Sequence, residues 1–238
     1  MSALPRIAPE PPGAETVYVW ELPVRVTHWL IFLSIAVLSV TGFYIGDPFI
    51  ALGGPARDHF VMGTVRVIHL YAAIVFTLSV FVRLYWMFAG NSYARWREFV
   101  PVTRQRRQSV RQAMRFYAFV RREPEVYAGH SGLAGATYGI IFLIYLLMIA
   151  TGLALYTVYA PIGSPFQFFR FLIPIFGGLQ VARLIHHIGM WLLLIFVIHH
   201  VYSAVLFSIS ERSGIIDSIF SGYKRVPSTS DEAKERDV

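Results

Sequence analysis

The chain of 238 residues contains no cysteine. This absence excludes disulfide bonds, zinc sites with thiolate ligands and iron–sulfur clusters held by the protein itself. Any redox chemistry must therefore use cofactors that histidine binds or that are held without covalent bonds.

Charged residues are scarce as well. They make up 15% of the chain, whereas hydrophobic residues make up 55%. Soluble globular chains carry about 25% charged residues, and so few charges cannot cover a water-facing surface. A soluble enzyme is thus excluded, and a chain that resides in a lipid bilayer is predicted. The net charge of +7 does not indicate nucleic-acid binding, because the arginines lie between apolar segments.

The first 24 residues lack a basic segment followed by an apolar core, and no small-residue cleavage site follows the first apolar stretch. This pattern differs from that of a secretory signal peptide. We therefore interpret residues 1–24 as an N-terminal cytoplasmic segment and the apolar stretch after it as an uncleaved membrane anchor.

Four apolar stretches are long enough to cross a bilayer as helices, which takes about 20 residues. They are residues 27–45, 67–88, 133–158 and 184–210. Each must be helical, because a single strand would leave its backbone unpaired in lipid. The sequence predicts an all-α integral membrane protein, a four-helix bundle over residues 25–210, with a cytoplasmic tail at 211–238.

The connection between the second and third predicted spans is rich in arginine. Its nine arginines are Arg95, Arg97, Arg104, Arg106, Arg107, Arg111, Arg115, Arg121 and Arg122, and its three glutamates are Glu98, Glu123 and Glu125. Basic connections stay on the cytoplasmic side of a membrane. We therefore expect both termini to be cytoplasmic, segments 46–66 and 159–183 to face outward, and the protein to lie in the cell inner membrane.

Two further segments are not predicted to cross the membrane. Residues 162–178 are rich in Phe and interrupted by Pro, so they are too broken for a fifth span and are expected to lie along the interface or against a partner. The charged tail after Pro227 is expected to be disordered.

Eight histidines occur in the chain, and ionisable groups in membrane spans are rare and usually functional. His186 and His200 are 14 residues apart in one span, so they lie within about 40° of the same helix face and about 21 Å apart along it. His69 begins the second span at the level of His186, and His28 begins the first span at the level of His200. The sequence predicts two pairs, His69 with His186 and His28 with His200.

Two such pairs at opposite depths are typical of two haems with bis-histidine ligation. A lone membrane histidine more often makes an ordinary helix-to-helix hydrogen bond, which is what we expect of His59 and His130. His187 and His199 are rotated by about 100° from their neighbours and point elsewhere.

Three of the four histidines follow an arginine by three residues. These arginines, Arg25, Arg66 and Arg183, could neutralise haem propionates, or they could be boundary arginines whose head groups reach water. Gly42 lies 14 residues after His28, at the depth of the other pair, where the lack of a side chain lets a flat ring approach. Small-residue helix packing is the alternative, as for Gly135 and Gly139.

The first and third spans also share a short pattern, Leu-x-x-Thr-Gly at 38–42 and Met-x-x-Thr-Gly at 148–152. The similarity is weak, and the sequence assigns it no role.

Two stretches resemble the signatures of a known family, the b-type cytochrome subunit of membrane-bound nickel–iron hydrogenases. They are RVTHWLIFLSIAVLSVTG at 25–42 and HHIGMW at 186–191, continued to Phe196 and His200. The resemblance covers residues 17–210. One departure is Leu184, where the family favours a small residue beside the ligand.

The resemblance implies two haems b with His28, His69, His186 and His200 as axial ligands, the same four residues that the spacing selects. His187 falls where the family has Arg or His, which favours a propionate or proton-coupled role. The resemblance also implies that the chain anchors the small and large hydrogenase subunits at the outer face and passes electrons to quinone.

A haem with two axial histidines has no open position, so it transfers electrons and binds no substrate. No catalytic residue is predicted, and a partner must split hydrogen, because the chain has no cysteine to hold nickel or clusters. A quinone pocket is expected near the inner pair, with His130, His199 and the arginine-rich connection as candidates. The expected partners are hydrogenase, quinone and membrane lipid, without nucleic acid, and a homo-oligomer within the complex is left open.

Three alternatives remain from the sequence. A cytochrome b subunit of a formate dehydrogenase or thiosulfate reductase would use a similar bundle. A proton transporter with histidine relays is a different class, and the lack of Asp and Glu in spans 27–45, 67–88 and 184–210 argues against it. A haem-free structural anchor would have no use for paired histidines.

Overall fold

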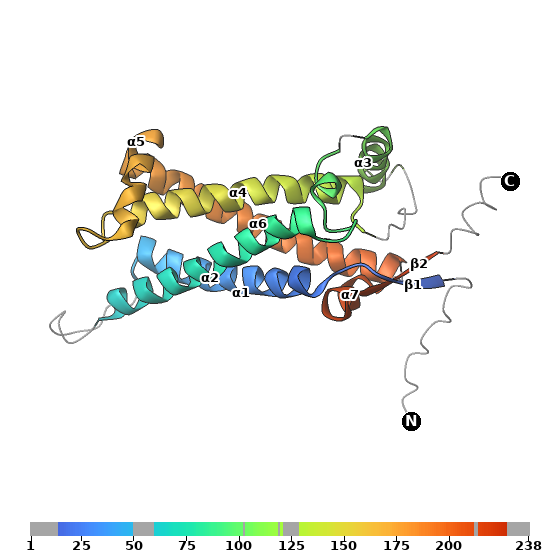
Figure 1. The fold of residues 1–238 in the computed structure, drawn as a ribbon, viewed down its shortest axis with the longest axis horizontal. Coiled ribbons are helices and arrows are strands. Elements are labelled where there is room, and N and C mark those ends of the chain that lie inside the picture. Colours follow the sequence, from blue (N-terminus) through green and yellow to red (C-terminus); the bar gives the residue numbers. More distant parts are fainter. Residues whose placement is uncertain are drawn as a thin grey trace, which may run out of the picture.

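The computed structural model describes residues 14–49, 60–101, 103–118, 120, 129–211 and 214–227. Within them, four long helices form an elongated bundle (Figure 1). They are α1 (Leu22–Gly46), α2 (Val61–Ala89), α4 (Gly132–Tyr156) and α6 (Leu179–Glu211). All four are long and apolar enough to cross a membrane, so the predicted spans are confirmed. His59, Arg121, Arg122 and the tail after Pro227, for which the sequence makes predictions, lie outside the described residues.

The helices begin between one and six residues before the predicted spans do. Pro23 lies in the first turn of α1, a position where its missing N–H costs nothing. At the start of α4, the hydroxyl of Ser131 accepts a hydrogen bond from the backbone N–H of Ala134 at 3.2 Å, which satisfies one of the unpaired donors of the first turn.

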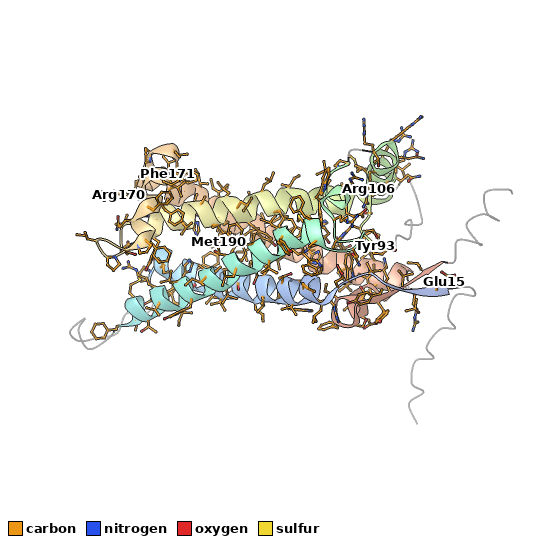
Figure 2. The ribbon with its side chains drawn as sticks, in the orientation of Figure 1. Glu15, Tyr93, Arg106, Arg170, Phe171 and Met190 are labelled. Carbon is orange, nitrogen blue, oxygen red and sulfur yellow. The ribbon has the colours of Figure 1, made fainter. Side chains whose placement is uncertain are left out.

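The bundle consists of two closely packed helix pairs, α1 with α2 and α4 with α6, which meet each other less closely. Large apolar side chains cover the outer surfaces: Val40 is 69% exposed, Leu143 67% and Ile198 71%. In water this exposure would be unfavourable, whereas lipid is their natural surrounding. Charged side chains gather at the ends, as Arg106 and Arg170 show, while Met190 lies between the helix pairs (Figure 2).

The interior contains a cluster of buried residues that we call the central apolar layer. It comprises Ile31, Ile35, Phe76, Val80, Ile141, Tyr145 and Leu193. Phe76 and Tyr145 meet edge to face, with ring centroids 5.2 Å apart. Leu193 is halfway between the two predicted ligands of α6, so this layer separates the two histidine levels.

Both described ends of the chain fold together at one end of the bundle. Strand β1 (Ala14–Tyr18) pairs antiparallel with β2 (Tyr223–Pro227). The short helix α7 (Ile215–Ser221) precedes β2 and ends at Gly222, whose φ of 93° favours glycine. Residues 215–227 of the predicted tail 211–238 therefore form a helix and a strand. The sequence did not predict these strands, because segments so far apart in the chain give no local signal of pairing.

The arginine-rich helix α3 (Arg104–Tyr117) lies at this same end (Figure 1). It follows the 3-10 turn η2 (Trp96–Glu98). Glu98 and Phe99 pass across α4 at Gly135 and Gly139. A Cβ at Gly135 would lie 2.0 Å from the carbonyl oxygen of Glu98, and one at Gly139 would lie 2.9 Å from that of Phe99. The two glycines thus leave room for the connecting segment beside α4. They do not mediate the helix-to-helix packing that was expected from the sequence.

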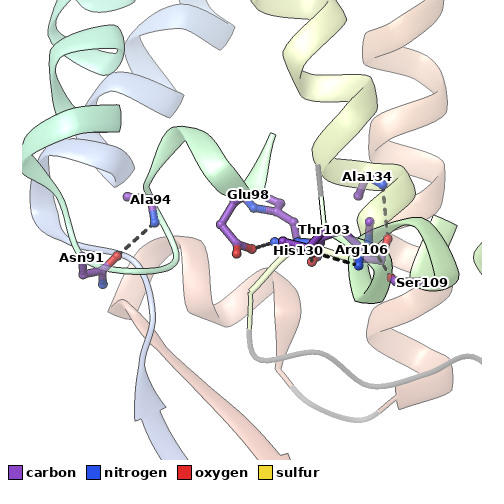
Figure 3. A network of polar contacts seen from close by, with 10 residues as sticks. Asn91, Ala94, Glu98, Thr103, Arg106, Ser109, His130 and Ala134 are labelled. Atoms are coloured by element: carbon purple, nitrogen blue, oxygen red, sulfur yellow. Dashed lines mark hydrogen bonds and ion pairs between the residues drawn. The ribbon is translucent and has the colours of Figure 1, made fainter. Parts of the chain in front are cut away.

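A polar network fixes α3 to the start of α4 (Figure 3). Arg106 forms an ion pair with Glu98 and donates to the carbonyl oxygen of His130 at 2.7 Å. The hydroxyl of Ser109 accepts from the N–H of Gly132 at 2.8 Å. The arginine-rich connection is therefore attached to the bundle.

The opposite end is closed by η3 (Pro165–Phe171) and α5 (Leu172–Ile175). Gln167 donates to the carbonyl oxygens of Thr157 at 2.9 Å and Ala160 at 2.8 Å, which ties η3 to the end of α4. As predicted, this Phe-rich segment is not a fifth span: within the described residues only four helices could cross a membrane.

Candidate functional site

The structure brings His28 of α1 and His200 of α6 together at the end of the bundle that holds α3. Their ring centroids are 6.2 Å apart and the rings are inclined by 57°. The Nδ1 atom of His28 is buried and has no hydrogen-bond partner among the described residues. The hydroxyl of Tyr138 lies 3.2 Å from Nδ1 of His200, and Phe196 stacks on that imidazole.

His69 of α2 and His186 of α6 lie at the other level: the position of a Cβ at Gly42 is 3.7 Å from Cε1 of His69 and 3.7 Å from Sδ of Met190, one turn after His186. Each imidazole is held by a threonine of a neighbouring helix: Thr41 Oγ1 is 2.8 Å from Nδ1 of His69, and Thr151 Oγ1 is 2.8 Å from Nδ1 of His186. Both predicted pairs therefore connect the α1/α2 side of the bundle with α6.

These residues fit a haem. Imidazole nitrogens bind transition metals at about 2 Å, so two imidazoles on one ion have ring centres about 6 Å apart, close to the separation of His28 and His200. At the other level, glycines leave space beside the rings. A Cβ at Gly42 would be 3.7 Å from Cε1 of His69, and one at Gly152 would be 3.4 Å from Cε1 of His186.

The three predicted propionate arginines have partners in the protein. Arg25 donates to the carbonyl oxygen of Phe220, although its Nε is buried without a partner among the described residues. Arg66 stacks over the ring of Tyr159 at 4.7 Å. Arg183 donates to Gln180 Oε1 at 2.8 Å. These contacts agree with boundary arginines, and a role toward propionates stays a prediction.

The remaining histidines differ in surroundings. His187 is exposed beside the end of α1, with Cε1 3.3 Å from where a Cβ of Gly46 would be. His199 is exposed and lies 3.5 Å from the hydroxyl of Ser203. Neither joins the two pairs.

His130 lies in an aromatic environment, with ring centroids 4.7 Å from Trp20 and 4.8 Å from Tyr138. Its Nδ1 is buried without a hydrogen-bond partner among the described residues, so the expected ordinary hydrogen bond is missing at this nitrogen. Burial, with smaller contributions from nearby cations such as Arg83 and Arg106, lowers the pKa of His130 to about 3. The imidazole is therefore neutral at physiological pH.

Arg83 is the residue that the sequence interpretation missed. It is only 7% exposed inside α2, where its guanidinium lies 5.4 Å from the ring of Phe99 and 5.9 Å from that of Phe142. Its hydrogen bond to the carbonyl oxygen of Ala94 is long, at 3.5 Å. No carboxylate of the described residues forms an ion pair with it, although the carboxylate of Glu21 lies within electrostatic range, as does His28. A lone arginine in an apolar run was the available signal.

The chain matches the family model described as "Prokaryotic cytochrome b561" over residues 19–222. It therefore belongs to this family, and it is a membrane cytochrome that binds b-type haem and transfers electrons.

The names of individual relatives agree with the family that the two sequence signatures resemble. A Cupriavidus necator protein named "Probable Ni/Fe-hydrogenase B-type cytochrome subunit" is 41% identical over 213 residues, which cover 88% of this chain and 87% of that protein. A Bradyrhizobium diazoefficiens protein of the same name is 40% identical, with 90% and 87% covered. In Escherichia coli K12, a "Probable Ni/Fe-hydrogenase 1 B-type cytochrome subunit" is 39% identical, with 87% and 90% covered.

Proposed function

We propose that this chain is the di-haem membrane anchor of a nickel–iron hydrogenase. It anchors the small and large hydrogenase subunits at the outer membrane face, accepts electrons from the iron–sulfur clusters of the hydrogenase and passes them to the quinone pool. The names of the relatives favour this partner over a formate dehydrogenase or a thiosulfate reductase. The observation that carries the proposal is the convergence of four histidines into two pairs, one at each end of the bundle.

Each pair would hold one haem b: His69 with His186 at the outer level, and His28 with His200 at the inner level. When bound, the haems supply one-electron transfer. The histidines would hold and orient the two haems, Gly42 would leave room for a ring beside His69, and the central apolar layer would exclude water between the two levels.

The orientation is part of the proposal. The end with α3 carries the basic helix, and basic segments stay in the cytoplasm. The described parts of both terminal segments meet at this end through β1 and β2. We propose that residues 1–24 and 211–238 are cytoplasmic, that residues 25–210 form the di-haem domain, and that the membrane is the inner membrane. Quinone then binds near the inner pair, where the neutral His130 has an unpaired buried nitrogen.

Haem stoichiometry tests the proposal most directly. We expect the purified protein to contain two haems b per chain, because two bis-histidine sites are proposed, and its reduced-minus-oxidised spectrum should show b-type bands. A pyridine haemochrome assay against protein mass from amino-acid analysis gives the ratio. A fully loaded preparation with one haem per chain would contradict the two-site arrangement.

Arg83 is proposed to neutralise a propionate of the inner haem, because it is a buried cation without an ion-pair partner among the described residues. Arg83→Met should lower the midpoint potential of the inner haem, since a nearby cation favours the reduced form. At a fixed potential the ratio of reduced to oxidised inner haem should fall about thirtyfold, as for charges about 8 Å apart at an effective dielectric of about 20.

Redox titration of the purified complex measures this ratio. The matched control is Arg83→Lys, which keeps the charge and should retain most of the wild-type potential. If the methionine variant titrates like the wild type at both haems, Arg83 has no such role.

A further inference from the structure

We propose that Thr41 and Thr151 are positioning residues that fix the tautomer and the orientation of His69 and His186. The inference rests on the proposed function, since it takes these two histidines as ligands of the outer haem. It concerns two hydroxyl groups that lie outside the predicted set of site residues.

The two threonines have the same surroundings on two different helices. Thr41 Oγ1 lies 2.8 Å from Nδ1 of His69 and donates to the carbonyl oxygen of Val37 at 2.7 Å. Thr151 Oγ1 lies 2.8 Å from Nδ1 of His186 and donates to the carbonyl oxygen of Leu147 at 2.8 Å. The same hydrogen-bonding arrangement therefore occurs at both histidines, which indicates the same role for both threonines.

The hydrogen bonds determine which ring nitrogen carries the proton. A threonine hydroxyl has one proton and two acceptor lone pairs. Here the proton is directed to the carbonyl one turn back, so the oxygen must accept from the imidazole. Nδ1 of His69 and of His186 is then protonated, and Nε2 keeps the lone pair that binds a metal. The tautomer follows from the network, since hydrogens are assigned from it.

Burial makes these bonds effective. Thr41 is 8% exposed and Thr151 is 0% exposed, so water does not compete for the hydroxyls. The following residue in each case is a glycine, Gly42 or Gly152, whose missing side chain leaves room beside the imidazole Cε1. The Thr-Gly sequence therefore combines a hydrogen bond to one edge of the imidazole with space beside it. This explains the weak pattern shared by the first and third spans.

The inner level lacks this arrangement. Nδ1 of His28 has no partner among the described residues, and Nδ1 of His200 has the hydroxyl of Tyr138 at the longer distance of 3.2 Å. A hydrogen bond from the second ring nitrogen makes a histidine ligand more basic, and a more basic ligand favours the oxidised metal. The threonines should therefore hold the outer haem at a lower potential than it would have without them.

The test uses Thr41→Val and Thr151→Val in the purified complex with its haems bound. Valine keeps the branched shape and removes the hydroxyl. We expect the midpoint potential of the outer haem to rise. The ratio of reduced to oxidised outer haem at a fixed potential should increase about tenfold, the change that follows when the oxidised form loses the roughly tenfold affinity that an outer-shell partner supplies. The inner haem should titrate as in the wild type. The low-spin electron paramagnetic resonance signal of the outer haem should shift as the imidazole planes become free to rotate.

Two kinds of control separate positioning from packing. Thr41→Ser and Thr151→Ser restore the hydroxyl and should restore the potential. Thr137→Val removes a threonine of α4 that donates to the carbonyl oxygen of Leu133 at 2.9 Å and has no hydrogen bond to a histidine within the described part of the chain, so it should change neither haem.

The outcomes are distinguishable. Loss of the outer haem in a valine variant, with recovery in the serine variant, also supports the positioning role. Two fully occupied haems with wild-type potentials and spectra in both valine variants would overturn it. If the wild-type chain contains a single haem, or if His69→Ala and His186→Ala keep both, the proposed function fails instead.

Discussion

Replacing His200 by alanine is expected to leave one haem per chain in place of two. The imidazole of His200 is one of two proposed axial ligands at the inner level, and the ring of His28 is its only proposed partner there, 6.2 Å away between centroids. His28 alone would hold the inner haem weakly, because the proposal assigns no further ligand at this level. The pyridine haemochrome ratio measures the loss.

His199→Ala is the matched control for haem content, because His199 is the adjacent histidine of α6 and is exposed. It should retain two haems. The pairing itself is tested by the double variant His28→Ala with His200→Ala, which should lose the same single haem as either change alone. Full haem occupancy after His200→Ala would contradict the assignment of His28 and His200 to the inner haem. Loss of two haems in the double variant would contradict the proposal that these two histidines bind the same haem.

The second large effect is expected from His69→Ala. Electron transfer from hydrogen to quinone should fall by more than about 100-fold, since loss of an axial ligand should cost at least as much as loss of an outer-shell partner. Hydrogen oxidation with a soluble dye should persist, because the partner alone carries out that reaction. Both rates are measured on the same membranes with hydrogen as donor.

Leu78→Ala serves as the control for this variant. Leu78 lies on the same helix, is 62% exposed and faces outward, so both rates should stay near the wild type. If His69→Ala abolished dye reduction and quinone reduction equally, the proposed division between the partner and this chain would be wrong.

Hydropathy and helical periodicity predicted most of the fold and the two histidine pairs. The four spans follow from apolar length alone, and the 14-residue interval between His186 and His200 follows from the helical turn. Apolar length and residue spacing are both local properties of the chain. They predict the structure well here because an isolated segment in lipid can satisfy its backbone hydrogen bonds only as a helix.

Other features could not be predicted, because they depend on contacts between distant segments. The role of Thr41 becomes visible only when α2 places His69 beside it. The use of Gly135 to admit the chain at Glu98 also requires the folded connection. Arg83 was available as a signal, since a charge in an apolar run is costly, but its burial without an ion pair among the described residues appears only in the packed bundle.

The central apolar layer has an electrical consequence. Its residues, from Ile31 on α1 to Leu193 on α6, carry no charge, so on the proposed arrangement only electrons pass between the two levels and no compensating proton travels with them. An inward electron then moves against a voltage that is negative inside, at a cost of up to about 2.3 kcal/mol per 100 mV for a complete crossing. The bundle would thus make the rate of quinol formation respond to how strongly the cell has energised its membrane.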